Sequence, residues 1–373
     1  MLTPFDDYPV HQTPAPIAHA GSGHPDHYDR FWFNGYTEDL YFAVAMGIYP
    51  NRGVIDAAFS VVSNHTQRSV FASGRAPLDR TATSVGPVEI QIIEPLRTNR
   101  VIVDAPEHGL RADLTFHART AAYEEPRQTK HHGTRLFTDM TRASQLGSWA
   151  GTLTAGDRTE TFTERVYGTK DRSWGIRPAG LPAPAAPEPA AGQLFFLWAP
   201  LNFDDVGVHF MTFEDADGQP WAKTAAILPL LSDDTPVYGP DTLAEHVDIT
   251  HAVNWAPGLR RSNSAVLTLN DHTEPATIAL EPLLTFRMKG AGYFHPQWAH
   301  GLWHDELVVG GECADVADLD NLELPNVHVQ QVMRATWGHR TGIGVLEQLA
   351  IGPHAPSGFT GLLDGARARS PQS

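Results

Sequence analysis

The sequence predicts an all-β fold of two antiparallel β-barrels or sandwiches in tandem. Short runs of β-branched and aromatic residues recur along the chain and are bounded by Gly, Pro, Asp or Asn, which is typical of strands and turns. The chain has 373 residues, which is longer than a domain with a single hydrophobic core usually is, so we expect two domains. A Pro/Ala-rich stretch at residues 179–191 can neither pair in a sheet nor continue a helix, so it separates them.

The predicted organisation has five parts. Residues 1–28 are rich in Pro, His and Asp without periodicity, which predicts an N-terminal arm. A first β-domain follows at 29–178, then the linker at 179–191 and a second β-domain at 192–360. Residues 361–373 are predicted to form a flexible tail.

The first domain begins with a predicted hairpin. Residues 40–49 and 54–62 are strand-like apolar runs, and the sequence Pro-Asn-Arg-Gly at 50–53 supplies the turn between them. Further strands are predicted at 88–93, 100–104, 110–119, 147–155 and 158–167. Short strands at this spacing are typical of a barrel or a sandwich.

The second domain repeats this strand content. Pro325 would end a short helix that we expect within residues 314–324. Strands are predicted at 194–198, 206–214, 224–230, 265–269, 276–280, 302–309 and 342–351.

Composition excludes several classes of function. The formal net charge of −16, without a Lys/Arg stripe, disfavours nucleic acids and anionic membrane surfaces as partners. The sequence has no apolar run of about 18 residues and no signal-peptide pattern, so we expect a cytoplasmic protein without membrane insertion. The single cysteine, Cys313, excludes an internal disulfide and is expected to be a buried, inert thiol.

One candidate site lies at residues 167–177, where charged residues alternate with a Trp flanked by Ser and Gly. A carboxylate against an aromatic wall loses hydration, which raises its pKa and suits it to general-acid catalysis near neutral pH. Asp171, close to Trp174, is the candidate for that role. The alternative is that Asp171 caps a turn or pairs with Arg172 or Arg177, and the sequence leaves both interpretations open.

Residues 168–175, Gly-Thr-Lys-Asp-Arg-Ser-Trp-Gly, resemble the Arg-Asp-His-Ser-Trp-Gly signature of a family of tandem lipocalin-like proteins. That family is distantly similar to the carotenoid 1,2-hydratases (hydroxyneurosporene synthases) and to lipocalin-like pericyclases. The resemblance also takes in residues 49–53, 104–110 and 292–312, so it extends over most of the chain from 31 to 359. It implies two lipocalin-like, calycin-type barrels.

The resemblance also implies a role for the motif. In the hydratase relatives an acidic residue protonates an isolated double bond, and by resemblance that role falls on Asp171. The chain departs from the family at Arg172, which stands where His is usual. Because a guanidinium does not release a proton at working pH, a proton relay through Arg172 is lost, and we expect Arg172 and Trp174 to bind substrate instead.

A second candidate site is the His- and Trp-rich segment at residues 293–306. If 302–309 is a strand, His304 and Glu306 share one face, so His304 could act as a base oriented by Glu306. His300 is an alternative proton acceptor. The structural alternative is that these His and Trp side chains simply pack between the barrels.

A metal site in the same segment is a further alternative. His295, His300 and His304 could supply three nitrogens to zinc with a fourth position open, although Pro296 and Gly301 break any helix that would align them. We therefore assign no metal ligand. The residues expected to line a substrate cavity are, besides Arg172 and Trp174, Trp198, Asn202, Tyr293, His295, Trp298 and Trp303.

These observations lead to a hypothesis of function. Phosphate-binding loops, a serine nucleophile elbow and a dinucleotide fingerprint are absent from the sequence, so we expect no cofactor. The leading hypothesis is a lyase, hydratase or isomerase that performs acid–base chemistry on a terpenoid, steroid or polyaromatic molecule in a barrel cavity. The alternatives are a non-catalytic carrier of a hydrophobic ligand and a metal-dependent hydrolase. The sequence is also compatible with a homodimer.

Overall fold

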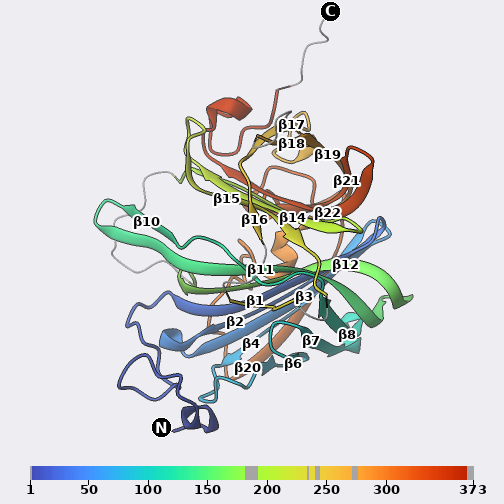
Figure 1. Cartoon of the computed structure of the whole chain (residues 1–373). Helices are drawn as coiled ribbons and strands as arrows, with labels where there is room; N and C mark the ends of the chain where they lie inside the picture. Colours follow the sequence, from blue (N-terminus) through green and yellow to red (C-terminus); the bar gives the residue numbers. More distant parts are fainter. Residues whose placement is uncertain (1, 181–191, 233–234, 240–243, 271–275, 368–373) are drawn as a thin grey trace, which may run out of the picture.

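Regular structure in the computed structural model is almost entirely β-strand, which confirms the all-β prediction. The structure describes residues 2–180, 192–232, 235–239, 244–270 and 276–367. In these ranges the strands form two barrel-like sheets, as two lipocalin-like barrels in tandem would (Figure 1). Helical structure in the same ranges is limited to short 3-10 turns: η1 (Pro4–Asp7), η2 (Pro50–Arg52), η3 (Pro106–His108), η4 (Met288–Ala291), η5 (Leu324–Asn326) and η6 (Ala355–Ser357). None of these helices is long and apolar enough to cross a membrane.

The first sheet has 13 strands in the described part of the chain, arranged in the order β20-β4-β3-β2-β1-β12-β11-β8-β7-β6-β5, with β9 and β10 paired to β11. All of its strand pairs are antiparallel. From the first half of the chain it contains β1 (His27–Tyr36), β2 (Leu40–Tyr49), β3 (Val54–Ser63), β4 (Thr66–Arg75), β5 (Ser84–Val85), β6 (Val88–Glu94), β7 (Thr98–Ala105), β8 (Leu110–Ala118), β9 (Tyr123–Glu124), β10 (Gln128–His132), β11 (Arg135–Ala155) and β12 (Arg158–Ile176).

The second sheet has 9 strands in the described residues, in the order β16-β15-β14-β13-β22-β21-β19-β18-β17, and curves as a half-barrel in the upper part of Figure 1. Its strands are β13 (Leu194–Asn202), β14 (Val206–Glu214), β15 (Pro220–Pro229), β16 (Glu245–His246), β17 (Ile249–Trp255), β18 (Ser262–Leu269), β19 (Ala276–Arg287), β21 (Val329–Trp337) and β22 (Arg340–Ile351).

The predicted hairpin at residues 40–62 is present. β2 and β3 pair antiparallel from Leu40 opposite Ser63 to Tyr49 opposite Val54. The turn between them ends at Gly53, whose φ of +67° lies in the left-handed region that a glycine adopts without strain. The turn residues therefore set the register of the two most apolar strands of the first sheet.

The first barrel is nearly closed and its interior is packed with side chains. A Cβ on Gly86, in the turn between β5 and β6, would meet Ala72 of β4 and Val309 of β20, so the two ends of the sheet approach each other. Large buried aromatic residues fill the space inside, among them Phe33, Phe42, Phe59, Phe116, Trp149 and Phe162. The lumen of this barrel is therefore a packed core.

β20 (Leu307–Asp315) crosses the predicted division between the domains. The chain leaves the first sheet after β12 and enters the second at β13, and residues 181–191 of the predicted linker lie outside the described residues. β20 then returns and pairs antiparallel with β4 along its whole length (Figure 1). The first sheet thus takes an edge strand from the second half of the chain, which joins the two halves through the sheet itself.

Three local predictions for this region were wrong. The strand predicted at 302–309 begins only at Leu307, because residues 302–306 run as a loop before β20. The helix expected within 314–324 is absent from this described segment, where β20 continues to Asp315 and turns follow. Cys313 is exposed rather than buried, because alternate residues of an edge strand face solvent.

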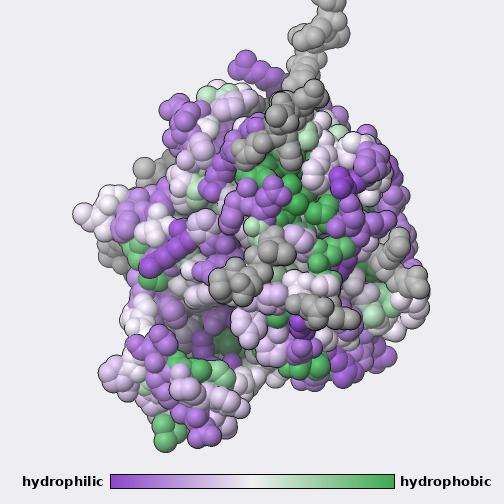
Figure 2. Space-filling model, in the orientation of Figure 1, coloured by the Kyte–Doolittle hydropathy of each residue, from purple (hydrophilic) through white to green (hydrophobic). Residues whose placement is uncertain are grey.

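The two sheets pack against each other through a second apolar cluster. Tyr41 of β2 stacks on Phe286 of β19 with ring centroids 4.6 Å apart, and Trp32 of β1 and Trp198 of β13 belong to the same cluster. The visible face of the molecule is largely hydrophilic, and hydrophobic residues gather in its upper half, where the half-barrel lies (Figure 2). The buried layer between the sheets is where the polar residues described next are found.

Candidate functional site

β1 turns a row of polar side chains toward the second sheet. Successive residues of a strand point to opposite faces, so Phe31 and Phe33 enter the core of the first barrel. Arg30, Trp32 and Asn34 point the other way, and all three are buried. Burying the Arg30 guanidinium on this face carries a large desolvation cost, so neighbouring groups or a ligand must compensate its charge.

Strand register extends this face across the first sheet. Asp171 of β12 is the register partner of Trp32. Ser173 of β12 is the partner of Arg30 on one side and of Arg142 of β11 on the other. The backbone ladder therefore assembles an aspartate, an indole and two guanidinium groups from three neighbouring strands.

The second sheet supplies the opposite wall. Trp198 of β13 and Glu347 of β22 are register partners. Tyr293, from the loop after η4, closes the side. Together these groups line a cavity of about 20 Å³, which has room for roughly one water molecule. Its lining residues are Arg30, Trp32, Arg142, Asp171, Ser173, Arg177, Trp198, Tyr293 and Glu347.

This cavity, here called the inter-sheet cavity, lies between the two sheets rather than inside a barrel. Both walls are hydrogen-bonded sheets, and the Asn34 Nδ2 and Tyr41 hydroxyl groups of the first sheet donate to Gln330 Oε1 of the second. Gln330 Nε2 in turn donates to Glu347 Oε2 at 2.6 Å. A ligand larger than water therefore enters only if the sheets or the 293–306 loop move.

Among the residues that line the inter-sheet cavity, Asp171 is the strongest candidate for a proton-transferring group. Burial raises its pKa to about 6, and the nearby Glu125 and Glu347 carboxylates act in the same direction, while Arg142 opposes them. Arg142 Nε lies 3.1 Å from Asp171 Oδ2, so Arg142 is its ion-pair partner. Asp171 thus neither caps a turn nor pairs with Arg172 or Arg177.

The two neighbouring glutamates are more fully partnered. Glu347 Oε1 lies 2.6 Å from His328 Nε2, and Glu125 Oε1 lies 3.2 Å from His209 Nε2. Burial alone would raise the pKa of each glutamate, but these contacts and the Arg142 charge outweigh it and lower both pKa values. Glu125 and Glu347 therefore stay ionised, and their charges favour the protonated form of Asp171.

Several hydrogen-bond donors at the inter-sheet cavity have no partner among the described residues. They are Nε and Nη2 of Arg30 and the indole Nε1 atoms of Trp32 and Trp198. Arg30 uses its remaining terminal nitrogen, Nη1, to donate to the Tyr293 hydroxyl at 3.0 Å. Buried donors are nearly always satisfied in folded proteins, so this set is an exception that favours an acceptor ligand.

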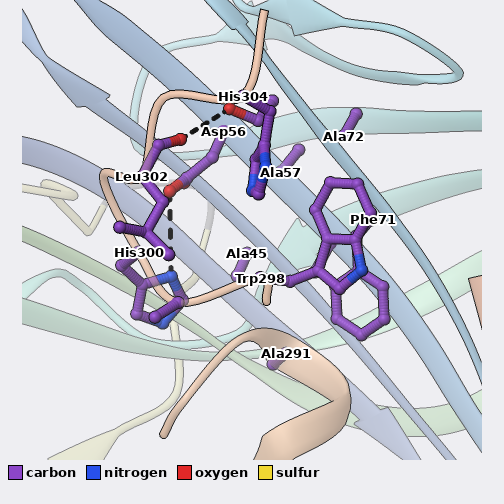
Figure 3. A pocket seen from close by; sticks show the side chains of 13 residues that line it. Ala45, Asp56, Ala57, Phe71, Ala72, Ala291, Trp298, His300, Leu302 and His304 are labelled. Atoms are coloured by element: carbon purple, nitrogen blue, oxygen red, sulfur yellow. Dashed lines mark hydrogen bonds and ion pairs between the residues drawn. The ribbon is translucent and has the colours of Figure 1, made fainter. Parts of the chain in front are cut away.

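A second cavity of about 10 Å³ lies beside the first, between β3, β4 and the 293–306 loop. Figure 3 shows Asp56 and His300 facing each other on one side, with Trp298 and His304 on the other. His300 Nδ1 lies 4.0 Å from Asp56 Oδ2, and the Gly301 amide donates to the same oxygen at 2.6 Å. Burial raises the pKa of Asp56 to about 6 and lowers the pKa of His300 well below its usual value.

The two cavities meet at one aromatic contact. The Tyr293 ring, which borders the inter-sheet cavity, meets the His300 ring edge-on with centroids 4.8 Å apart. The neighbouring Tyr49 hydroxyl is buried without a hydrogen-bond partner in the described part of the chain. Because Tyr293 stands between them, His300 belongs to the second cavity and does not reach Asp171 directly.

Asp171 comes from the first candidate segment, Tyr293 from the second, and Trp198 was expected to line a cavity; the structure brings these three together at the inter-sheet cavity. His300, His304 and Trp298 share the second cavity.

The remaining candidates lie elsewhere. Trp174 is exposed, and Arg172 pairs with Asp29 at 2.6 Å and stacks over the Phe31 ring, so neither reaches the inter-sheet cavity. Asn202 Nδ2 donates to the Tyr36 hydroxyl at 2.9 Å and serves as a link between the sheets.

The proposed pairing of His304 with Glu306 has no geometric support. Both residues lie in the loop before β20, where the alternation of strand side chains does not place them on one face. Glu306 is exposed and forms an ion pair with Arg75, whose guanidinium also stacks over the exposed Trp303 ring at 5.1 Å. His304 instead packs against Trp298 with centroids 4.7 Å apart.

The three histidines of the postulated zinc site have separate surroundings. His295 Nε2 lies 2.8 Å from Glu312 Oε1, and its Nδ1 accepts the backbone amides of Gln297 and Trp298. His300 faces Asp56, whereas His304 is exposed. Within the described residues no three His, Cys, Asp or Glu side chains are grouped so that they could hold a metal ion.

Sequence reasoning missed Arg30, Trp32, Arg142, Asp56 and Glu347. A signal for four of them was present, because each charged residue stands in a strand that is otherwise mostly apolar or small. Glu347, for example, lies within the buried run 344–350 of β22. Charged residues in such strands are rarely buried unless a partner or a ligand compensates them.

Comparison with known proteins adds a family but no function. No curated protein matches the chain. One solved structure with a similar fold is that of a Nitrosomonas europaea protein that carries the provisional description AttH; it is 11% identical, with a TM-score of 0.49 over 86% of this chain and 92% of that one. A likeness of that size indicates nothing about activity. Over residues 2–360 the chain matches the family of unknown function DUF8625, and it therefore belongs to that family.

Proposed function

We propose that the chain is a cofactor-independent enzyme of the lyase, hydratase or isomerase type, in which Asp171 transfers a proton to a hydrophobic small molecule held in the inter-sheet cavity. The observation that carries the proposal is the buried Asp171 carboxyl, whose pKa is raised to about 6 beside unpartnered hydrogen-bond donors. A group with a pKa near the working pH can give up a proton and take it back within one turnover.

The surroundings of Asp171 support a particular kind of intermediate. Arg30, Arg177 and the two indole N–H groups would stabilise negative charge that develops on an oxygen atom of the substrate. They would disfavour a carbocation, because the guanidinium groups repel it. The proposal therefore favours proton transfer at a carbon conjugated to an oxygen function over protonation of an isolated double bond, which the hydratase resemblance suggested.

Asp171 would act as both donor and acceptor in this reaction. His300 and His304 line the second cavity, so neither is placed to exchange a proton with a substrate at Asp171. In an isomerisation, the Asp171 carboxylate takes a proton from one carbon and the resulting acid returns it to another, so that atoms and charge balance. Hydration or elimination adds or removes one water in the same site.

The test uses the purified protein and a small-molecule extract from its own host. Wild type, Asp171→Asn and the surface control Asp113→Asn are incubated with the extract, and mass spectrometry follows each compound. We expect wild type and Asp113→Asn to convert one compound into an isomer or into a product that differs by one water, whereas Asp171→Asn leaves that compound unchanged. Asp113 is a suitable control because it pairs with Arg100 on the exposed surface.

Two results would contradict the proposal. An Asp171→Asn variant that forms the same product at the same rate excludes Asp171 as the proton donor. A wild-type protein that binds a compound and releases it unchanged would identify a carrier instead.

A further inference from the structure

The acids around the inter-sheet cavity already have close side-chain partners. Each glutamate at or behind its wall has a basic or imidazole partner, Glu347 with His328 and Glu125 with His209. Arg142 lies 3.1 Å from Asp171 and 3.8 Å from Glu125, so it is shared between two acids. The closest side-chain partners of these three acids are therefore groups other than the remaining two arginines.

Arg30 and Arg177 are those remaining arginines. Neither forms an ion pair with an acid among the described residues, and both line the inter-sheet cavity. Arg30 is 2% exposed, and the guanidinium of each arginine lies over the Tyr293 ring, at 4.7 Å for Arg30 and 6.0 Å for Arg177. Because an unpaired charge removed from solvent is unfavourable, the buried Arg30 and the half-buried Arg177 favour binding of an anion.

The free atoms of Arg30 indicate which anion. Nε and Nη2 form the side of a guanidinium that holds both oxygens of a carboxylate. Elsewhere in this protein the same edge does so: Arg100 Nε and Nη2 donate to the two Asp113 oxygens at 2.7 and 2.6 Å, and Arg261 binds Asp320 likewise at 2.8 and 2.6 Å. In Arg30 this edge is buried and has no partner in the described part of the chain.

Two further donors complete the set. The buried Trp32 and Trp198 indole Nε1 atoms come from opposite walls of the inter-sheet cavity and have no acceptor within the described residues. A planar, singly charged group suits this site better than a phosphate, because Asp171 and Glu347 also line it and repel a doubly charged ion more strongly.

We propose that the inter-sheet cavity, widened by movement of the 293–306 loop, binds the carboxylate group of a hydrophobic monocarboxylic acid. Arg30 holds both carboxylate oxygens through Nε and Nη2, Arg177 supplies the second positive charge, and the Trp32 and Trp198 indoles donate from the two walls. This inference rests on the proposed function for what happens to the acid after binding, but the binding itself can be tested alone.

The test measures binding of acetate and benzoate against their neutral amides, acetamide and benzamide. Thermal unfolding and calorimetry are recorded for wild type, Arg30→Met, Arg177→Met and the surface control Arg100→Met, with chloride used to equalise ionic strength. We expect the carboxylates to raise the Tm of wild type and of Arg100→Met, while the amides do not. Benzoate affinity should fall at least about tenfold in Arg30→Met and less in Arg177→Met, because a charge-assisted bidentate contact is lost in the first.

Several outcomes would overturn the inference. Equal Tm shifts with benzoate, benzamide and chloride would mean that no carboxylate site exists, a comparison that needs only wild type if Arg30→Met does not fold. Inorganic phosphate that binds where benzoate does not would assign the site to another anion.

The Asp171→Asn variant separates this inference from the proposed function. It should still bind benzoate, and at least as tightly as wild type, because a negative charge beside the ligand is removed. If Asp171→Asn loses turnover but wild type does not bind benzoate, Asp171 is supported as the proton donor and the carboxylate site is rejected. If wild type binds benzoate but Asp171→Asn keeps its turnover, the carboxylate site is supported and Asp171 is rejected as the proton donor.

Discussion

Asp171 and Glu214 are both buried carboxylates on β-strands, but their surroundings differ. Glu214 of β14 accepts contacts from His251 Nε2 at 2.6 Å and His354 Nε2 at 3.1 Å, and the Thr212 hydroxyl adds a third at 3.2 Å. Asp171 has its ion pair with Arg142 and otherwise faces a cavity. Glu214 is surrounded by hydrogen-bonding partners, whereas one side of Asp171 faces a cavity.

The two pKa values follow from this difference. Burial raises the pKa of both groups, but the His251 and His354 contacts outweigh it at Glu214 and lower its pKa to about 2. At Asp171 burial prevails and the pKa is about 6. Burial alone therefore does not distinguish a structural carboxylate from a reactive one. The number of hydrogen-bonding partners does, and a cavity beside the under-partnered acid indicates where a ligand would supply the missing contacts.

The largest expected effect of this difference is on catalysis. Once a substrate is known, Asp171→Asn should lower kcat/KM by about 10²–10⁴-fold, the usual contribution of a general acid or base. Glu214→Gln should leave kcat/KM within a few-fold of wild type, because Glu214 lines neither cavity described above. Steady-state kinetics of both variants would measure it, and similar losses in the two would remove the distinction between them.

The second-largest expected effect is on how stability depends on pH, which should differ between wild type and Asp171→Asn. The folded-state pKa of Asp171, about 6, exceeds its ordinary value of 3.8, so ionising it costs more in the folded state and stability falls as pH rises through this interval. Asp171→Asn removes that cost. Its free energy of unfolding relative to wild type should therefore rise by about 2.4 kcal/mol between pH 4 and pH 7. Urea denaturation across that range would measure the change, and a constant difference would mean that Asp171 ionises normally.

Glu214→Gln should show the opposite dependence and a smaller effect. Because the folded-state pKa of Glu214 is lowered from 4.5 to about 2, its stabilising contribution is fully present above pH 4.5 and is lost as pH falls toward 2. We expect a loss of about 2 kcal/mol at pH 7, reduced from the full shift because solvent screens part of the cluster. Urea denaturation at pH 7 and pH 3 would check it, since the loss should shrink at pH 3.

Much of the fold was predictable because strand patterns are local. The β2–β3 hairpin follows from two apolar runs and one turn, whereas the start of β20 at Leu307 does not. β20 is an edge strand of the other sheet with alternating exposure, so its apolar pattern is weak and its partner, β4, is about 240 residues away along the chain. Pairing across that distance leaves little trace in a single sequence.

The candidate site was predictable only in part for the same reason. Asp171 stood out because a carboxylate beside aromatic residues is chemically distinctive. Arg30 and Glu347 reach Asp171 only through sheet register and the packing of one sheet on the other, which the order of residues does not specify. The local density of His and Trp at 293–306 drew attention to Glu306 and Trp303, which the loop turns toward solvent.

The smallest expected effect concerns that solvent-facing group. Arg75 binds Glu306 through two nitrogens and lies over Trp303, but all three side chains are exposed, and exposed ion pairs contribute little to stability. Arg75→Met should therefore leave both Tm and turnover unchanged, in contrast to Asp171→Asn. Thermal unfolding at low and high salt, together with the turnover assay, would measure this. If Arg75→Met abolished turnover, the ion pair would have a functional role, and the sequence-based hypothesis that Glu306 orients His304 would regain support over the inter-sheet cavity.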